Sequence, residues 1–187
     1  YPDKKIILTR DSDKFLSLSE RTDIANGIKV GKDDAILFIS IHVNSSLNKA
    51  SSGYEVWYLS PGYRRNVLDK SVAGGDNSLY SILNVLTEEE YTTESIMIAK
   101  FIMDGLQAQI GAESKSRGIK AEEWFVVKNA LMPSVLIELG FVSNEAEAKN
   151  LNDDKYLKKA TLGIYNGITA YITHFERSRG FTVANEN

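Results

Sequence analysis

The most restrictive feature of this sequence is residues 35–41, an almost unbroken apolar run with a single polar residue. Such a run is typical of a strand covered on both faces, as in a parallel or mixed sheet between helices. Further short strands are predicted over residues 5–9, 53–59, 124–127 and 134–137. The sequence therefore predicts a sheet with a buried centre.

Longer segments with helical periodicity separate these strands. A helix over residues 18–30 is predicted after Ser17, whose spacing from Glu20 is that of a capping box. Residues 94–110 and 155–175 each carry an apolar stripe at helical spacing. Strands that alternate with helices favour an α/β domain of three layers, αβα, with a mostly parallel or mixed central sheet and helices on both faces.

Residues 63–92 fit this alternation poorly. They contain a glycine pair, a short helical pattern over residues 79–86 and an acidic run over residues 88–90. We interpret them as a helical insertion at the rim of the sheet. We expect one domain over residues 1–176 and a loose polar tail over residues 177–187.

Composition excludes several classes of function. The 187 residues are 43% hydrophobic, which suits one compact domain. The formal charge of -3 offers no basic field for nucleic acid, and no apolar run reaches the roughly 18 residues of a membrane span. The absence of cysteine excludes thiolate metal sites, a cysteine nucleophile and disulfides.

Two side chains stand where sheet proteins place their chemistry. His42 follows the apolar strand of residues 35–41, and Glu138 ends the strand of residues 134–137. A buried carboxylate is costly unless it is paired or functional. From position alone, a structural histidine and a solvent-facing glutamate are equally good interpretations. His174, near the end of the last predicted helix, is assigned no role, because a cation there complements the helix dipole.

Four stretches match one family in order. They are residues 9–13 with the helix that follows, residues 38–44, residues 52–58 and residues 132–144. Together they resemble the zinc-dependent N-acetylmuramoyl-L-alanine amidases of bacterial cell walls, over about residues 4–173. The resemblance implies hydrolysis of the amide between N-acetylmuramic acid and the L-alanine of the stem peptide, in peptidoglycan outside the cytoplasm.

The resemblance also assigns roles to the two candidate residues. The family holds its zinc with two histidines and one glutamate, and only His42 carries over as a ligand. The first histidine and the glutamate lie in a segment that precedes the opening strand of this chain, so we expect the chain to lack that strand and both ligands. Glu138 carries over as the catalytic carboxylate, which takes a proton from water and passes it to the leaving amine.

Further expectations follow from the resemblance. Zinc would bind the full-length enzyme but bind this chain weakly or not at all, which would leave the chain inactive by itself. The insertion of residues 63–92 could cover the active site until an activating protein displaces it. The alternative is a catalytically dead cell-wall binding or regulatory module of the same fold. A nucleotide-binding α/β domain is a third interpretation, but no phosphate-binding loop supports it.

Overall fold

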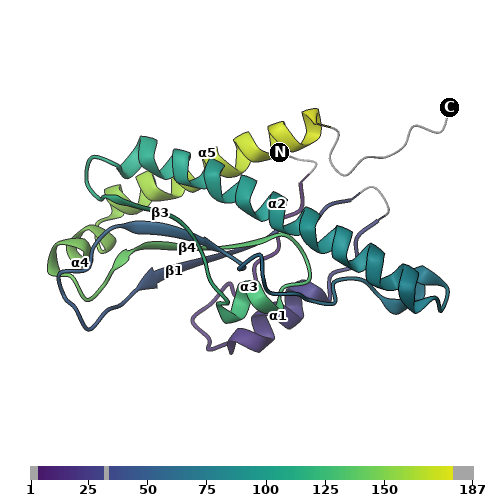
Figure 1. The fold of residues 1–187 in the computed structure, drawn as a ribbon. Helices are drawn as coiled ribbons and strands as arrows, with labels where there is room; N and C mark the ends of the chain where they lie inside the picture. Colours follow the sequence, from purple (N-terminus) through teal and green to yellow (C-terminus); the bar gives the residue numbers. More distant parts are fainter. Residues whose placement is uncertain (1–3, 32–33, 179–187) are drawn as a thin grey trace.

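The computed structural model describes residues 4–31 and 34–178. Helices and strands alternate along most of the chain (Figure 1). In chain order they are α1 Leu18–Asn26, β1 Phe38–Asn44, β2 Tyr54–Tyr58, the 3-10 helix η1 Lys70–Ala73, α2 Asn77–Ile110, β3 Ser116–Ala121, α3 Phe125–Asn129, β4 Ser134–Phe141, α4 Glu145–Leu151 and α5 Asp154–Arg177.

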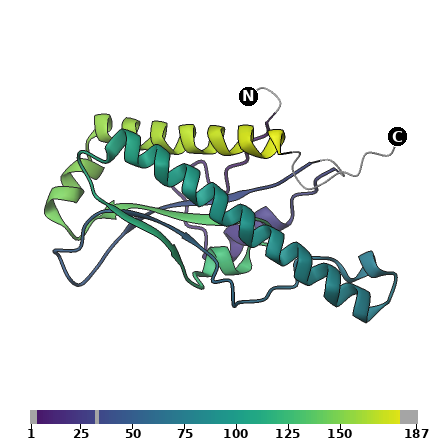
Figure 2. The same cartoon turned by 45° about the horizontal axis from the view of Figure 1, so that its top comes forward.

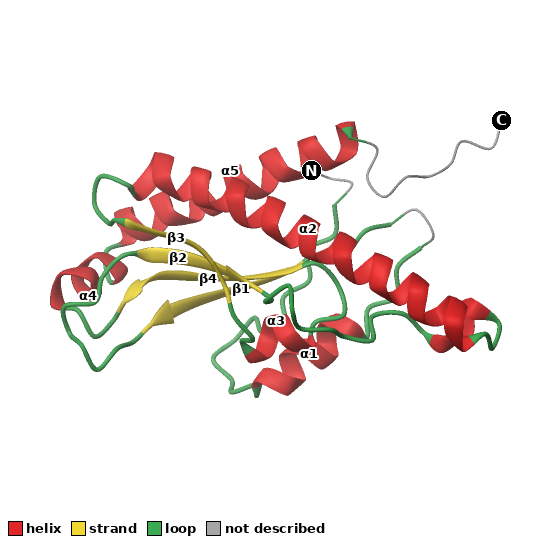
Figure 3. Cartoon of the chain, viewed as in Figure 1, coloured by secondary structure: helices red, strands yellow, loops and turns green. Residues whose placement is uncertain are grey.

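The four described strands form one mixed sheet in the order β1-β4-β2-β3. β1 runs parallel to β4 and β2 runs parallel to β3, while β2 and β4 are antiparallel. Helices α2 and α5 cover one face, and the shorter α1 and α3 lie against the other (Figure 3). The predicted three-layer architecture with a mixed sheet is therefore confirmed.

The larger core lies between the sheet and the pair α2 and α5. Its fully buried members include Ile98 and Leu106 from α2 with Val135 and Ile137 from β4. The two helices cross in close contact (Figure 2). A Cβ placed on Gly105 would lie 2.1 Å from the carbonyl oxygen of Gly163, so the backbones touch where glycines face each other.

A smaller core lies on the opposite face. Phe38 and Leu136 from the sheet pack there with Ala25 of α1 and with Val126 and Val127 of α3. The side chain of Asn26 links the two helices. Its Nδ2 donates to the backbone carbonyl of Asn129 at 2.9 Å, and its Oδ1 accepts from the backbone N–H of Leu131 at 2.9 Å. These short helices leave the carboxyl ends of β1 and β4 uncovered on this face (Figure 1).

Two of the predicted strands are wrong. Residues 5–9 form no strand in the described structure, and Ile6 and Leu8 are 86% and 68% exposed. An apolar run becomes a strand only where a neighbouring strand takes up its hydrogen bonds. Residues 124–127 instead open α3, with Val126 and Val127 buried, because a short apolar run fits a buried helix as well as a strand.

Other boundaries also differ from the prediction. The capping box between Ser17 and Glu20 is present, but α1 ends at Asn26, four residues before the predicted end at residue 30. Strand β3 and helix α4 were not predicted. β3 is a mostly polar edge strand, so it lacks the apolar signal that identifies a central strand.

Residues 63–92, the predicted helical insertion, lead into the longest helix of the described structure. Their helical part is the beginning of α2, one helix of 34 residues whose first turn is capped by Asp76. This part of α2 extends past the sheet, at the end away from the arrowheads of β1 and β4 (Figure 1). That it could cover the active site stays a prediction.

The last helix lies close to the predicted residues 155–175. α5 continues through Arg177, one residue into the predicted tail, and residues 179–187 of that tail lie outside the described residues. Within the described ranges, the helices are all too short or too polar to cross a membrane.

Candidate functional site

His42 and Glu138 are direct neighbours across the sheet. They are Cα partners in the parallel pair β1 and β4, and Glu138 is in turn the partner of Glu55 in the antiparallel pair β4 and β2. Partners in register project from the same face of a sheet. That face carries α1 and α3, because Leu136, two residues before Glu138, belongs to the smaller core. The structure therefore places His42 and Glu138 side by side on one face, in the carboxyl-terminal halves of β1 and β4.

The carboxyl group of Glu138 is poorly satisfied. Its Oε2 is buried and has no hydrogen-bond partner among the described residues. Burial raises the pKa of Glu138 to about 7, and the negative charge of Glu55 adds to that rise. A carboxyl group with its pKa near neutrality can both accept and return a proton at physiological pH. An unpaired buried acid of this kind is more typical of a functional site than of a structural one.

His42 is held in place by a serine on its own strand. The Oγ of Ser40 lies 2.6 Å from Nε2 of the ring, so this hydrogen bond does not use Nδ1. Burial lowers the pKa of His42, and the positive charge of Arg21 on α1 lowers it further. Both effects favour the neutral imidazole, which is the form that binds metal ions.

Sequence reasoning missed a charged cluster next to this pair. Glu55 is only 2% exposed, and its carboxylate accepts from Asn44 at 3.0 Å, from Arg117 at 2.7 Å and from Lys120 at 2.6 Å. These contacts lower the pKa of Glu55 although its burial opposes them. The sequence did contain one signal for this cluster, namely a glutamate inside an apolar strand. Glu55 is two residues before Trp57, so the two side chains lie on the same face of that strand.

A second buried glutamate fixes the backbone around the site. Glu147 of α4 accepts from the backbone amides of Gly53 at 2.6 Å and Phe141 at 2.7 Å, and from the hydroxyl of Ser114 at 2.9 Å. These bonds tie the start of β2 to the end of β4. The bond from Phe141 fixes β4 at a point three residues after Glu138.

The described residues fit part of a zinc site. His42 offers one imidazole nitrogen, and the unpartnered oxygen of Glu138 lies in register with it. Within residues 4–31 and 34–178, however, His, Cys, Asp and Glu side chains form no group of three that could hold a metal ion. A catalytic zinc takes three protein ligands. The residues described here therefore do not make such a site by themselves.

The raised pKa of Glu138 predicts a pH dependence of stability. The folded protein binds this proton more tightly than the unfolded chain, whose glutamate titrates near 4.5. The free energy of unfolding should therefore fall as pH rises from about 4.5 to about 7, because the native state holds the proton that the unfolded state has lost. Urea unfolding at several pH values measures this trend. Glu138→Gln should flatten the trend over that window, and an unchanged slope would contradict the assignment.

These features define a class: an α/β domain with a mixed sheet in which a histidine and a half-buried acid meet in register in the carboxyl-terminal halves of two parallel strands. The chain belongs to the N-acetylmuramoyl-L-alanine amidase family, whose model matches residues 2–170. Both candidate residues lie within that match.

Several known proteins are similar to this chain. The N-acetylmuramoyl-L-alanine amidase LytC of Bacillus subtilis is 29% identical over 165 residues, which cover 88% of this chain and 26% of LytC. The amidase AmiA of Salmonella typhimurium is 27% identical over 94% of this chain and 63% of its own length. The chain thus spans less than two thirds of these curated relatives.

Solved structures give the same result. The catalytic domain of CwlV, an N-acetylmuramoyl-L-alanine amidase from Paenibacillus polymyxa, matches with a TM-score of 0.63 and 28% identity. The match covers 90% of this chain and 73% of CwlV. The CwlD amidase of Clostridioides difficile, solved in complex with the GerS lipoprotein, matches with a TM-score of 0.64 and 26% identity, over 90% of this chain and 75% of that one.

Proposed function

We propose that the full-length protein is a zinc-dependent N-acetylmuramoyl-L-alanine amidase of peptidoglycan. It would hydrolyse the amide between the lactyl group of N-acetylmuramic acid and the L-alanine of the stem peptide. The observation that carries this proposal is the unpartnered carboxyl oxygen of Glu138 in register with His42. Membership of the amidase family supplies the bond that is cut.

Glu138 is the proton carrier of this reaction. Its ionised form takes a proton from the attacking water, and the protonated form then donates that proton to the nitrogen of the departing alanine. A pKa of about 7 suits both steps, because neither protonation state is strongly favoured. Oε2 has no hydrogen-bond partner among the described residues, so no structural contact explains why this carboxyl group is placed here.

His42 is proposed as one ligand of the zinc ion. Ser40 holds the imidazole in a fixed orientation through Nε2, so the ring loses little freedom when it binds. Zinc, when bound, supplies a Lewis acid for the amide carbonyl and lowers the pKa of water. The other ligands of this zinc ion are not among the described residues that surround His42.

This assignment predicts weak zinc binding by the 187-residue chain. One imidazole with a neighbouring carboxylate gives little affinity, since zinc binding depends on several ligands arranged beforehand. We expect no tight one-to-one complex in a calorimetric titration with zinc, and no amidase activity from the chain alone. Tight binding by the monomer would show that a ligand has been misplaced.

The location and partners follow from the substrate. Peptidoglycan lies outside the cytoplasm, so we propose that the protein acts in the periplasm or cell wall. The complex of CwlD with GerS shows that one similar amidase assembles with another protein. We also propose that this protein has an activating partner. That partner would move residues 63–92 relative to the site.

The direct test is release of stem peptides from purified peptidoglycan. Full-length protein with zinc should generate new N-terminal alanine, and a chelator should abolish the reaction. The rival function is a cell-wall binding module without catalysis. It would bind peptidoglycan but release no peptide under any metal condition.

A further inference from the structure

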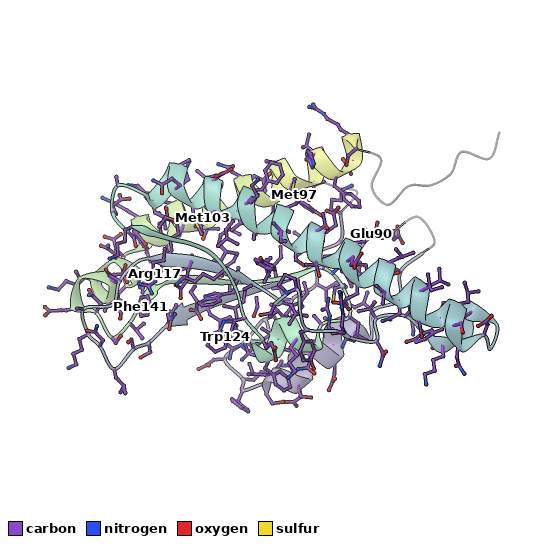
Figure 4. The ribbon with its side chains drawn as sticks, viewed as in Figure 1. Glu90, Met97, Met103, Arg117, Trp124 and Phe141 are labelled. Carbon is purple, nitrogen blue, oxygen red and sulfur yellow. The ribbon has the colours of Figure 1, made fainter. Side chains whose placement is uncertain are left out.

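Two cations lie at the β3 end of the row formed by His42, Glu138 and Glu55. Arg117 and Lys120, both on β3, donate to the same oxygen of Glu55 at 2.7 Å and 2.6 Å. An aromatic ring lies beside each cation. The guanidinium of Arg117 is 5.0 Å from the ring centre of Phe141 (Figure 4), and Nζ of Lys120 is 5.0 Å from that of Trp57. The cations are therefore fixed in place on the same face as Glu138.

The cluster has more positive charge than its carboxylate neutralises. One side chain of Glu55, 2% exposed, faces two cationic side chains that are each 31% exposed. Arg117 uses Nε for Glu55 and Nη1 for the carbonyl of Ser52 at 3.3 Å, out of the five N–H groups of a guanidinium. Lys120 likewise has more donors than its bond to Glu55 requires. The exposed side of the cluster is therefore a site for an anion.

The spacing of the row matches the spacing of groups along a peptide. Neighbouring strands lie about 4.8 Å apart, so β3 lies about 10 Å from Glu138 on β4, with β2 between them. A peptide extends by up to about 3.5 Å per residue, which places the second residue after a scissile amide about 7 Å away. The remaining distance of about 3 Å is no longer than a carboxylate side chain of the peptide or the side chain of Arg117.

We propose that Arg117 and Lys120 bind a carboxylate on the second residue of the substrate's stem peptide. This inference rests on the proposed amidase function and extends it to peptide specificity. The substrate crosses the strands, with its scissile amide beside Glu138 and its acidic residue over β3. Glu55 is a positioning residue, because it holds both cations towards the substrate without touching it.

The test compares two soluble muramoyl peptides that differ only at the second residue, which carries a free carboxylate in one and a carboxamide in the other. Full-length protein should show a KM about 10-fold lower for the carboxylate peptide, as one charge-assisted hydrogen-bond pair predicts, with similar kcat. Equal KM values for the two peptides would overturn the proposal.

Variants assign the preference to the two residues. Lys120→Met and Arg117→Gln should raise KM for the carboxylate peptide and leave KM for the carboxamide peptide nearly unchanged. Arg117→Lys should keep part of the preference because it keeps the charge. Lys149→Met, which removes a lysine whose side chain is 75% exposed on α4, is the matched control and should leave the ratio of KM values unchanged. A preference that survives in the Lys120→Met, Arg117→Gln double variant would contradict the proposal.

A binding measurement separates this inference from the proposed function. The catalytically impaired Glu138→Gln protein should bind N-acetylmuramoyl-L-alanyl-D-glutamate more tightly than the isoglutamine analogue. If wild-type protein cleaves neither peptide, the proposed function fails, and the binding preference still decides whether Arg117 and Lys120 form an anion site. Equal binding of the two compounds would refute the anion site even in an active amidase.

Discussion

Replacing Glu138 with glutamine should lower kcat of the full-length protein about 1,000-fold, because a positioned general acid and base contributes roughly 100-fold to 10,000-fold. Glutamine keeps the shape of the side chain but cannot exchange a proton with water or with the leaving amine. Zinc should stay bound, because Glu138 is not a ligand in this scheme. Peptide release from peptidoglycan measures the rate, and metal analysis measures the zinc content.

The variant should fold at least as well as the parent. Glutamine removes a buried carboxyl group whose ionised form is disfavoured by burial and by Glu55. Glu145→Gln is the matched control, since Glu145 lies on α4 with its side chain 87% exposed, and kcat should not change. Loss of zinc in Glu138→Gln would show that this carboxylate is a ligand, and a fall in kcat of less than 10-fold would show that it is not the proton carrier.

Glu88→Ala should cost about 3 to 5 kcal/mol of unfolding free energy, the usual result of breaking a buried ion pair from one side. Glu88 and Arg65 have side chains only 1% and 5% exposed, with a separation of 2.8 Å. The same guanidinium donates to the carbonyls of Val127 and Ala130. Removal of Glu88 would leave the charge of Arg65 buried at the end of α3 without its counter-ion.

The neighbouring residue provides the control. Glu89 is 59% exposed and lies 3.7 Å from Arg64, an exposed pair whose loss should change stability by no more than about 0.5 kcal/mol. Urea unfolding followed by circular dichroism compares Glu88→Ala with Glu89→Ala. Equal costs for the two changes would mean that the Arg65 contact does not anchor α2 to α3.

This contrast also revises the interpretation of the acidic run over residues 88–90. The sequence shows three adjacent glutamates, and a run of this kind is usually a solvated surface. In the structure, α2 turns Glu88 inward to Arg65, while Glu89 faces solvent. Adjacent helical positions differ by about 100° in direction, so only the packing of α2 decides which of them is buried.

The sequence by itself determined the layered α/β class, the capping box of α1, and the two candidate residues at strand ends. Those signals are local: an apolar run, a helical period, a serine three residues before a glutamate. The position of His42 and Glu138 at the ends of apolar strands was enough to predict that they meet, because parallel strands end at one edge of the sheet.

Only the tertiary structure decided the rest. Residues 5–9 have the composition of a strand but pair with no strand in the part of the chain that the structure describes, whereas polar β3 is a strand because β2 supplies its hydrogen bonds. The cluster of Glu55, Arg117 and Lys120 joins positions 62 and 65 residues apart in the chain. Strand pairing is a long-range contact, and neither composition nor periodicity specifies which strands will lie side by side.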